Sequence, residues 1–311
     1  MALQEGNRTV RMMGTKIDLN VTSHENPEYV LDTIVELLKK YEQRFSANDD
    51  ASELMAINQN AGITPVVVHP ELFELIQIGK EHSLAKNSLL NIAIGPLIQT
   101  WRIGFDDAKV PTDDAIQALL DKTNPCEIRL DEATQSVYLT KKGMKIDLGA
   151  LAKGYIADRI IDYLDDINAQ SALINLGGNL VTFGPQVKRA DLLWRIGIQN
   201  PIENRGESQI ILKVPNKSVV TSGIYERNLK QNGETFHHIF NPKTGYPVET
   251  ELASLTIVSD LSVDGEIWTT RLFGQTPADI LATVNQTPHI ECLIISKDGK
   301  VQYSTGLSQY L

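Results

Sequence analysis

Residues 147–154 read Asp-Leu-Gly-Ala-Leu-Ala-Lys-Gly and join a predicted strand over 144–148 to a predicted helix over 151–164. The small residues between the two favour a tight turn. The first amides of that helix, with Lys153 one turn in, suit a pyrophosphate, because a helix N-terminus is electropositive. A plain turn in which Asp147 caps nearby amides is the alternative, and the GxxxxGK[ST] pattern of a P-loop is absent.

Outward from this stretch, short predicted strands follow one another through tight turns over most of 126–304. On the N-terminal side, residues 10–21 predict a strand broken by a glycine turn, and 27–45 have a helical apolar period. Residues 91–104 are apolar and punctuated by glycine, so we expect a buried loop there. Strands that directly follow strands favour an α+β fold, with mixed or antiparallel sheets flanked by helices.

Charge and composition exclude several classes of protein. The 29 Lys and Arg against 39 Asp and Glu give a net charge of −10, which argues against nonspecific binding to nucleic acid or anionic membrane. Two cysteines, Cys126 and Cys292, cannot form a dense disulfide framework, and we expect two free buried thiols. No apolar run approaches the roughly 20 residues of a membrane-spanning helix.

Two adjacent histidines offer a candidate base. His237 and His238 end a predicted strand, so their side chains point to opposite faces and at most one faces a given site. A positioned imidazole accepts a hydroxyl proton near neutral pH. A hydrogen-bonded strand histidine without catalytic role is the commoner alternative.

A predicted helix over 266–273 carries a candidate cation site. Glu266 and Thr270 are four residues apart and share a helix face. A carboxylate and a hydroxyl, completed by a carbonyl and phosphate oxygens, suit a hard cation such as Mg²⁺. Acidic residues that simply favour the helix dipole are the alternative.

These and further segments, taken together and in order, resemble the ApbE family of FAD:protein FMN transferases. The matching patterns include D-L-G-x-x-A-K-G, N-L-G-G, T-S-G and H-I-x-[DN]-P-x-T-G-x-P. The segments are 13–15, 45–53, 91–97, 147–154, 175–178, 221–223, 238–247 and 266–270. Each pattern is weak alone, but their shared order over most of the chain is specific.

The resemblance implies a two-lobed fold with FAD in an active-site groove between the lobes and Mg²⁺ on its pyrophosphate. The implied FAD contacts are Met13, Asn48, Asn91, Ala93, Ile94, Gly95, Asp147, Lys153 and Phe240. The implied metal ligands are the Ala150 carbonyl and the Glu266 and Thr270 side chains. Asp264 competes with Glu266, because the family usually has Asp at this aligned position. His238 is the implied base, so the implied catalytic residues are His238, Lys153 and Glu266.

The implied activity is magnesium-dependent transfer of FMN from FAD to a Thr or Ser hydroxyl of an acceptor protein, with release of AMP. The resemblance also implies that the acceptor flavoprotein carries a D-G-x-[ST]-G-[AS]-[ST]-like flavinylation motif. Asn48 stands where many transferases have an aromatic residue, and some relatives with a small polar residue there resemble FAD pyrophosphatases. Magnesium-dependent hydrolysis of FAD to FMN and AMP is therefore one alternative, and a non-catalytic flavin-binding or delivery protein is another.

The implied ligand residues spread over 13–270, so neither half of the chain holds the site alone. We therefore expect a single domain over 1–311, in which a soft boundary near residue 125 separates the lobes. The first residues lack a signal-peptide pattern, which predicts a cytoplasmic protein. An exported, lipid-anchored protein whose signal has been removed is the alternative, because such members are common in the family. The sequence leaves the oligomeric state open.

Overall fold

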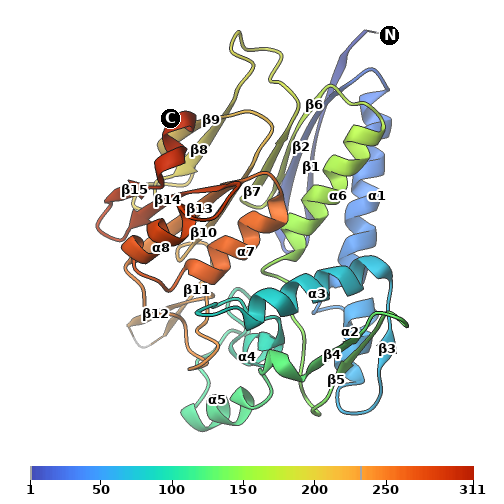
Figure 1. Cartoon of the computed structure of the whole chain (residues 1–311), viewed down its shortest axis with the longest axis vertical. Helices are drawn as coiled ribbons and strands as arrows, with labels where there is room; N and C mark the ends of the chain where they lie inside the picture. The colour runs from blue at the N-terminus through green and yellow to red at the C-terminus, as the bar shows by residue number, and fades with distance from the viewer. Residues whose placement is uncertain (1, 232) are drawn as a thin grey trace.

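The computed structural model describes residues 2–231 and 233–311. Its largest element is an eight-stranded sheet with the strand order β1-β2-β6-β7-β10-β13-β14-β15 (Figure 1). Every neighbouring pair in it is antiparallel, which confirms the predicted α+β class. Its strands are β1 (Gln4–Met12), β2 (Thr15–Ser23), β6 (Ser171–Leu176), β7 (Asn179–Phe183), β10 (Ser218–Gly223), β13 (Leu252–Ser259), β14 (Ile290–Ser296) and β15 (Val301–Tyr303).

Smaller sheets and the helices surround this sheet. The smaller sheets pair β3 (Val66–Val67), β5 (Ser136–Leu139) and β4 (Ile128–Asp131); β8 (Trp194–Gln199) and β9 (Ser208–Val214); and β11 (Asn228–Gln231) and β12 (Glu234–His237). The α-helices are α1 (Pro27–Phe45), α2 (Glu53–Gln59), α3 (Pro70–Leu84), α4 (Gly95–Trp101), α5 (Asp113–Leu120), α6 (Ala152–Asp166), α7 (Ser262–Leu272) and α8 (Pro277–Val284). The 3₁₀ turns are η1 (Ile92–Ile94), η2 (Pro125–Glu127) and η3 (Thr305–Tyr310).

The large sheet is covered on both faces. Helices α1 and α6 pack on the β2 and β6 side chains of one face, and α7 and α8 pack farther along it on β13 and β14. The β8–β9 hairpin and η3 cover the opposite face of β10, β13 and β14. Strand β13 is consequently buried at every position and lacks the polar alternation of a half-exposed strand.

Two tight turns lie side by side at one end of the sheet. Met13 and Gly14 connect β1 to β2 with positive φ angles of 51° and 67°, as a two-residue hairpin turn requires. Gly177 and Gly178 connect β6 to β7 in the same way, with φ angles of 66° and 96°. A Cβ at Gly177 would lie 2.1 Å from the Thr15 Oγ1, so the glycine allows the two turns to touch.

The structure overturns three expectations. Residues 144–148, expected as a strand, form no strand and lead as an irregular segment into the turn before α6. Most of the segment 91–104, expected as a buried loop, forms η1 and α4, because Asn91 caps η1 and Pro96 stands in the first turn of α4, where its missing N–H costs nothing. Cys126 is exposed, and only Cys292 is buried. In the described residues, no helix is long and apolar enough to cross a lipid bilayer.

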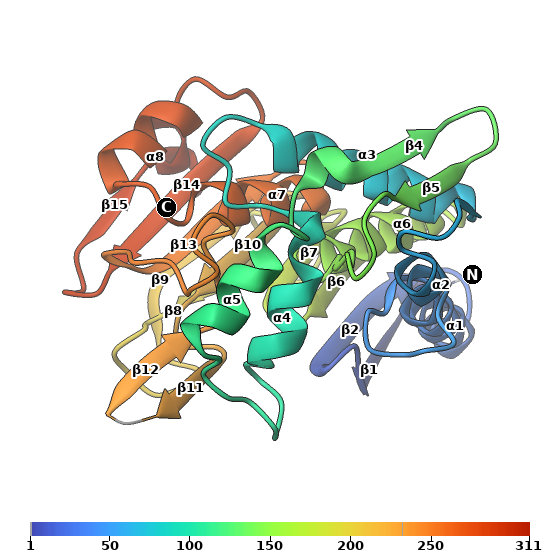
Figure 2. The ribbon, with the colours of Figure 1, turned by 90° about the horizontal axis from the view of Figure 1, so that it is seen from below.

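Helices α4 and α5 form a small separate core with the segment that follows β12 (Figure 2). Trp101 lies at its centre, fully buried, and its indole N–H donates to the Gly245 carbonyl at 3.0 Å. This core fixes the segment between His238 and Pro247 relative to α4. The division into two lobes and the soft boundary near residue 125 stay predictions.

Candidate functional site

The candidate site begins where α6 and α7 lie side by side (Figure 1). Lys153, in the first turn of α6, places its Nζ 2.8 Å from the Glu266 Oε1 on α7. The Glu266 side chain is 6% exposed and that of Lys153 is 27% exposed. The two residues that sequence analysis selected for pyrophosphate and metal are therefore in direct contact, with the lysine reaching toward solvent.

Glycine and a buried carboxylate hold α7 against α6. A Cβ at Gly154 would lie 2.6 Å from the Ser262 carbonyl oxygen, so only glycine allows this helix spacing. Asp158 accepts hydrogen bonds from the backbone N–H groups of Ser262 (2.7 Å) and Val263 (2.9 Å) at the start of α7. Burial raises the pKa of Asp158 to about 6, even though both amides favour the carboxylate. Leu261, at the N-cap position of α7, makes no side-chain cap bond, and Asp158 caps the helix in its place.

A second polar side chain reaches Glu266 from the sheet. Asn179, at the start of β7, donates from its Nδ2 to the Glu266 Oε1 at 3.2 Å. Its Oδ1 accepts from the Ser262 hydroxyl at 2.6 Å. The carboxylate on α7 is therefore held by groups from two other elements, α6 and β7.

The donor types that the resemblance implies are chemically suited to Mg²⁺ bound together with a substrate. The described residues contain no cluster of three His, Cys, Asp or Glu side chains that would form an all-protein metal cage. One carboxylate, the Thr270 hydroxyl one turn later and the Ala150 carbonyl are hard oxygen donors. Mg²⁺ is commonly held by one or two carboxylates together with substrate phosphates, and it keeps several waters.

Asp264, the competing ligand, lies in a different environment. Burial and the neighbouring Asp260 raise its pKa, while His289 acts in the opposite direction. Positions 264 and 266 are two residues apart on α7, so their side chains leave the helix in nearly opposite directions. The structure thus places Glu266, rather than Asp264, at Lys153.

The turn before α6 is joined to the segment that carries η1. Asp147 donates its backbone N–H to the Ile92 carbonyl at 2.9 Å, and its Oδ1 accepts from the Gly149 N–H at 2.8 Å. The capping turn considered from sequence is therefore present, and burial raises the pKa of Asp147. A Cβ at Gly95 would lie 2.7 Å from the Lys145 carbonyl oxygen, so glycine permits the close packing of these two segments.

Two further expected FAD-binding side chains, besides Asp147 and Lys153, bond within the chain. Asn91 caps η1 by accepting from the Ala93 N–H at 2.8 Å and donates to the Thr123 carbonyl at 2.8 Å. The exposed Asn48 accepts from the Gln99 amide at 3.2 Å. Asn91 therefore shapes this wall of the site, whereas Asn48 remains accessible.

The remaining expected contacts lie on three different segments. Met13 donates its backbone N–H to the Glu42 carboxylate at 2.7 Å, which ties the first hairpin turn to α1. Phe240 is buried against Trp101, with ring centroids 5.7 Å apart. Ala93 is fully buried, and Ile94 packs on the α4–α5 core.

The two histidines have separate partners, as the strand alternation predicts. The buried His237 accepts from the Ile239 N–H at its Nδ1 (3.3 Å), so its Nε2–H donates to the Val248 carbonyl (3.0 Å). His238 donates from Nδ1 to the Arg227 carbonyl at 3.2 Å, which leaves the lone pair on Nε2. Burial lowers the pKa of His238 to about 4, and the nearby positive charges of Arg227 and Lys153 act in the same direction. The His238 imidazole is therefore neutral at physiological pH.

Arg227 connects several parts of the site and was not anticipated from the sequence. Its carbonyl binds His238, and its positive charge acts on the Asp147 carboxyl. Its Nη2 lies 3.7 Å from the position of a Cβ at Gly14, in the first hairpin turn. Arg227 and Asp158 occur in no pattern that marks them in the sequence. Asn179 directly follows the N-L-G-G pattern, but only its contacts show what its side chain does.

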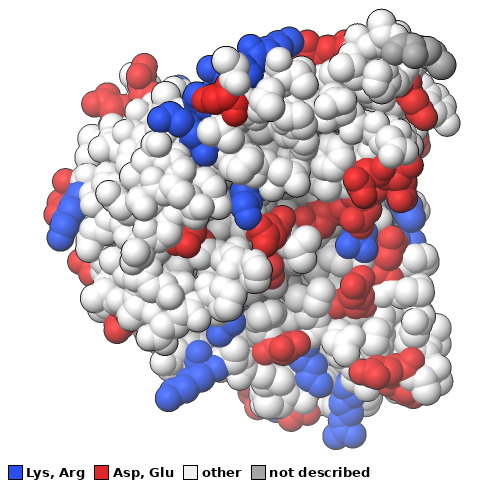
Figure 3. All heavy atoms as spheres, turned by 45° about the horizontal axis from the view of Figure 1, so that its top comes forward, with Lys and Arg blue, Asp and Glu red and all other residues white. Residues whose placement is uncertain are grey.

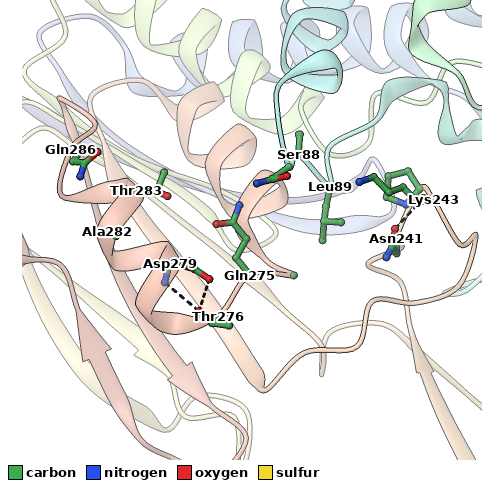
Figure 4. A pocket seen from close by; sticks show the side chains of 13 residues that line it. Ser88, Leu89, Asn241, Lys243, Gln275, Thr276, Asp279, Ala282, Thr283 and Gln286 are labelled. Atoms are coloured by element: carbon green, nitrogen blue, oxygen red, sulfur yellow. Dashed lines mark hydrogen bonds between the residues drawn. The ribbon is translucent and has the colours of Figure 1, made fainter.

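Two cavities lie beside this site. One, of about 620 Å³, is bounded by α8, the Ser88–Leu89 segment and the turn that carries Asn241 and Lys243 (Figure 4). The other, of about 520 Å³, shares Ser88 and Lys243 with it and extends to Asn91. Neither is lined by Lys153, His238 or Glu266. They flank the segment that follows His238 rather than the Lys153–Glu266 pair.

The charges on the surface agree with the acidic composition. On the face shown in Figure 3, acidic side chains form a row along one side, and basic side chains occur in small groups. This distribution differs from the broad basic patch typical of nucleic-acid binding.

Comparison with known proteins identifies the family. A model described as the ApbE family matches residues 13–294. A protein of Klebsiella pneumoniae (strain 342) named FAD:protein FMN transferase is 42% identical over 294 residues, 94% of this chain and 90% of that protein. A protein of the same name from Treponema pallidum (strain Nichols) is 33% identical over 98% of this chain and 88% of its own length. The crystal structure of the ApbE protein from Thermotoga maritima has a TM-score of 0.90, with 26% identity and 99% of each chain covered. This chain belongs to the ApbE family.

Proposed function

We propose that this enzyme transfers FMN from FAD to a Thr or Ser hydroxyl of an acceptor protein, releases AMP and depends on Mg²⁺. The observation that carries the proposal is the 2.8 Å contact between Lys153 and the buried Glu266, which pairs a phosphate-binding cation with a metal-binding carboxylate. The name FAD:protein FMN transferase, given to the Klebsiella and Treponema relatives, supports the same activity.

In this proposal, the start of α6 binds the pyrophosphate of FAD. Lys153 moves from the Glu266 carboxylate to the phosphate oxygens, and the adjacent amides of α6 add a favourable dipole. Glu266, Thr270 and the Ala150 carbonyl hold Mg²⁺, which supplies further neutralisation of the pyrophosphate charge when bound.

The transfer step is a displacement at the phosphorus of the FMN half. The acceptor hydroxyl oxygen forms a new bond to that phosphorus, and the bond from phosphorus to the bridging oxygen breaks. The bridging oxygen leaves with AMP, and the hydroxyl proton passes to the His238 Nε2. Since a base with a pKa of about 4 is weak, positioning and charge neutralisation contribute more than proton removal.

One incubation tests the proposal against its alternatives. The protein is mixed with FAD, Mg²⁺ and a peptide carrying the threonine-bearing motif, and the products are separated by mass spectrometry. A peptide heavier by the mass of FMN less one water, together with AMP, supports the transferase. Free FMN and AMP with unmodified peptide indicate the FAD hydrolase, the alternative suggested by the small polar residue at Asn48. Intact FAD indicates a flavin-binding protein. A peptide with alanine in place of threonine is the matched control.

A further inference from the structure

We infer that Asn179 is a positioning residue that orients the Glu266 carboxylate for Mg²⁺ binding. This inference rests on the proposed role of Glu266 as a metal ligand. It concerns a residue on β7 that lies outside the donor set of the ion.

The side chain of Asn179 is constrained at both ends. It is 2% exposed and directly follows the Gly177–Gly178 turn. The Ser262 hydroxyl donates to its Oδ1, which turns the Nδ2 amide toward Glu266. The opposite orientation would place an amide oxygen against a buried carboxylate without a hydrogen bond, which is unfavourable. Ser262 thereby selects the orientation in which Asn179 donates to Glu266.

The contact leaves one oxygen of Glu266 for the ion. Among the described residues, Lys153 and Asn179 both donate to Oε1. The Oε2 atom therefore carries the lone pairs that the ion needs. Groups that hydrogen-bond a ligating side chain fix its orientation and typically change metal affinity about 10- to 100-fold.

Asn179 becomes more important when Lys153 engages the substrate. Lysine is flexible, and its side chain is 27% exposed, whereas Asn179 is enclosed. Once Lys153 has turned to the pyrophosphate, Asn179 still donates to Oε1. A buried carboxylate without such a donor would lose both its orientation and part of its solvation.

Metal binding distinguishes positioning from a purely structural role. Mn²⁺ replaces Mg²⁺ as the probe, and electron paramagnetic resonance counts the free ion during titration of the protein–FAD complex. The variants are Asn179→Ala and Ser262→Ala. Thr182→Val is the matched control, because Thr182 is a buried polar residue of the same strand whose side chain, among the described residues, bonds only Lys217.

We expect Asn179→Ala to raise the Kd for Mn²⁺ about 10- to 100-fold. Ser262→Ala should raise it less, and Thr182→Val should leave it unchanged even if the protein unfolds at lower urea. A wild-type Kd in folded Asn179→Ala overturns the inference; if that variant does not fold, a wild-type Kd in Ser262→Ala does so. Glu266→Gln separates the two proposals. If Glu266→Gln binds Mn²⁺ as the wild type does, the proposed metal site is wrong. If Glu266→Gln loses Mn²⁺ binding but Asn179→Ala and Ser262→Ala keep it, only the role of Asn179 is wrong.

Discussion

Gly154 of α6 and Ser262 of α7 approach so closely that a Cβ on the glycine would lie 2.6 Å from the serine carbonyl oxygen. Alanine in place of a helix glycine normally stabilises a protein by about 1 kcal/mol. Here we expect Gly154→Ala to lower the free energy of unfolding by about 1–3 kcal/mol, because the helices must move apart. Urea denaturation measures the change. A more stable variant would show that the helices do not make this contact.

Replacement of the two candidate carboxylates should have unequal effects. We expect Glu266→Gln to lower the transfer rate on the order of 1,000-fold, the upper range for loss of one electrostatic stabiliser. Asp264→Asn is the matched control and should stay near the wild-type rate, since Asp264 lies by Asp260 and His289. Rates are measured over a range of Mg²⁺ concentrations. If Glu266→Gln kept the wild-type rate and Asp264→Asn lost activity, Asp264 rather than Glu266 would be the metal ligand.

His238 should contribute less than Glu266. Its pKa of about 4 keeps the His238 imidazole deprotonated above about pH 5, so the transfer rate should not depend on its protonation in that range. The rate should fall as the pH drops through about 4, where the imidazole becomes protonated. We expect His238→Gln to lower the rate by no more than about 100-fold, the low end for a general base. The measurement is the pH–rate profile of both proteins. An inflection near pH 6.5 that disappears in the variant would contradict the lowered pKa of His238.

Asp158 should make stability depend on pH. Its folded pKa of about 6 lies above the ordinary value of 3.8, so the folded state binds more protons between these two values. Stability due to this group is therefore present at low pH and is lost as the pH rises through about 6. Compared with Asp158→Asn, the wild type should lose stability between about pH 4 and 7. Denaturation at several pH values tests this, and a constant difference between the two proteins would refute it.

The two glycines between β6 and β7 should respond differently to alanine. Both have positive φ angles, so alanine strains each by about 1–2 kcal/mol. A Cβ at Gly177 would also lie 2.1 Å from the Thr15 Oγ1, whereas at Gly178 nothing lies within 4 Å. We therefore expect Gly177→Ala to be clearly more destabilising in thermal unfolding than its control, Gly178→Ala. Equal losses would mean that the two hairpin turns do not touch.

Local patterns predicted much of the fold. The glycine turn within 10–21, the helical period of 27–45 and the turn and helix that follow Asp147 concern neighbouring residues, and each is present. The strand expected over 144–148 is absent, so the prediction of a strand before this turn was wrong. The prediction of a loop over 91–104 was wrong. Glycine and proline usually indicate a loop, but here they stand in the first turn of helix α4.

Patterns also selected Lys153 and Glu266, which the structure brings into contact in the candidate site, but not the residues that hold them. Asn179 and Glu266 are 87 positions apart, and Asp158 and Ser262 are 104 apart. Such pairs have no period or spacing in the sequence, so they become visible only when the sheet and the helices are packed. The same holds for Arg227, an exposed residue in a connecting segment.

The contact between Lys153 and Glu266 also bears on biosynthesis. The two residues are 113 positions apart, so α6 leaves the ribosome well before its partner helix has been translated. During this interval Lys153 lacks the Glu266 carboxylate, and the surface of α6 that later contacts α7 lacks its partner helix. The capacity to handle a flavin nucleotide therefore arises late in synthesis, after most of the large sheet has been made. Premature termination before codon 266 would yield a chain that lacks this pair.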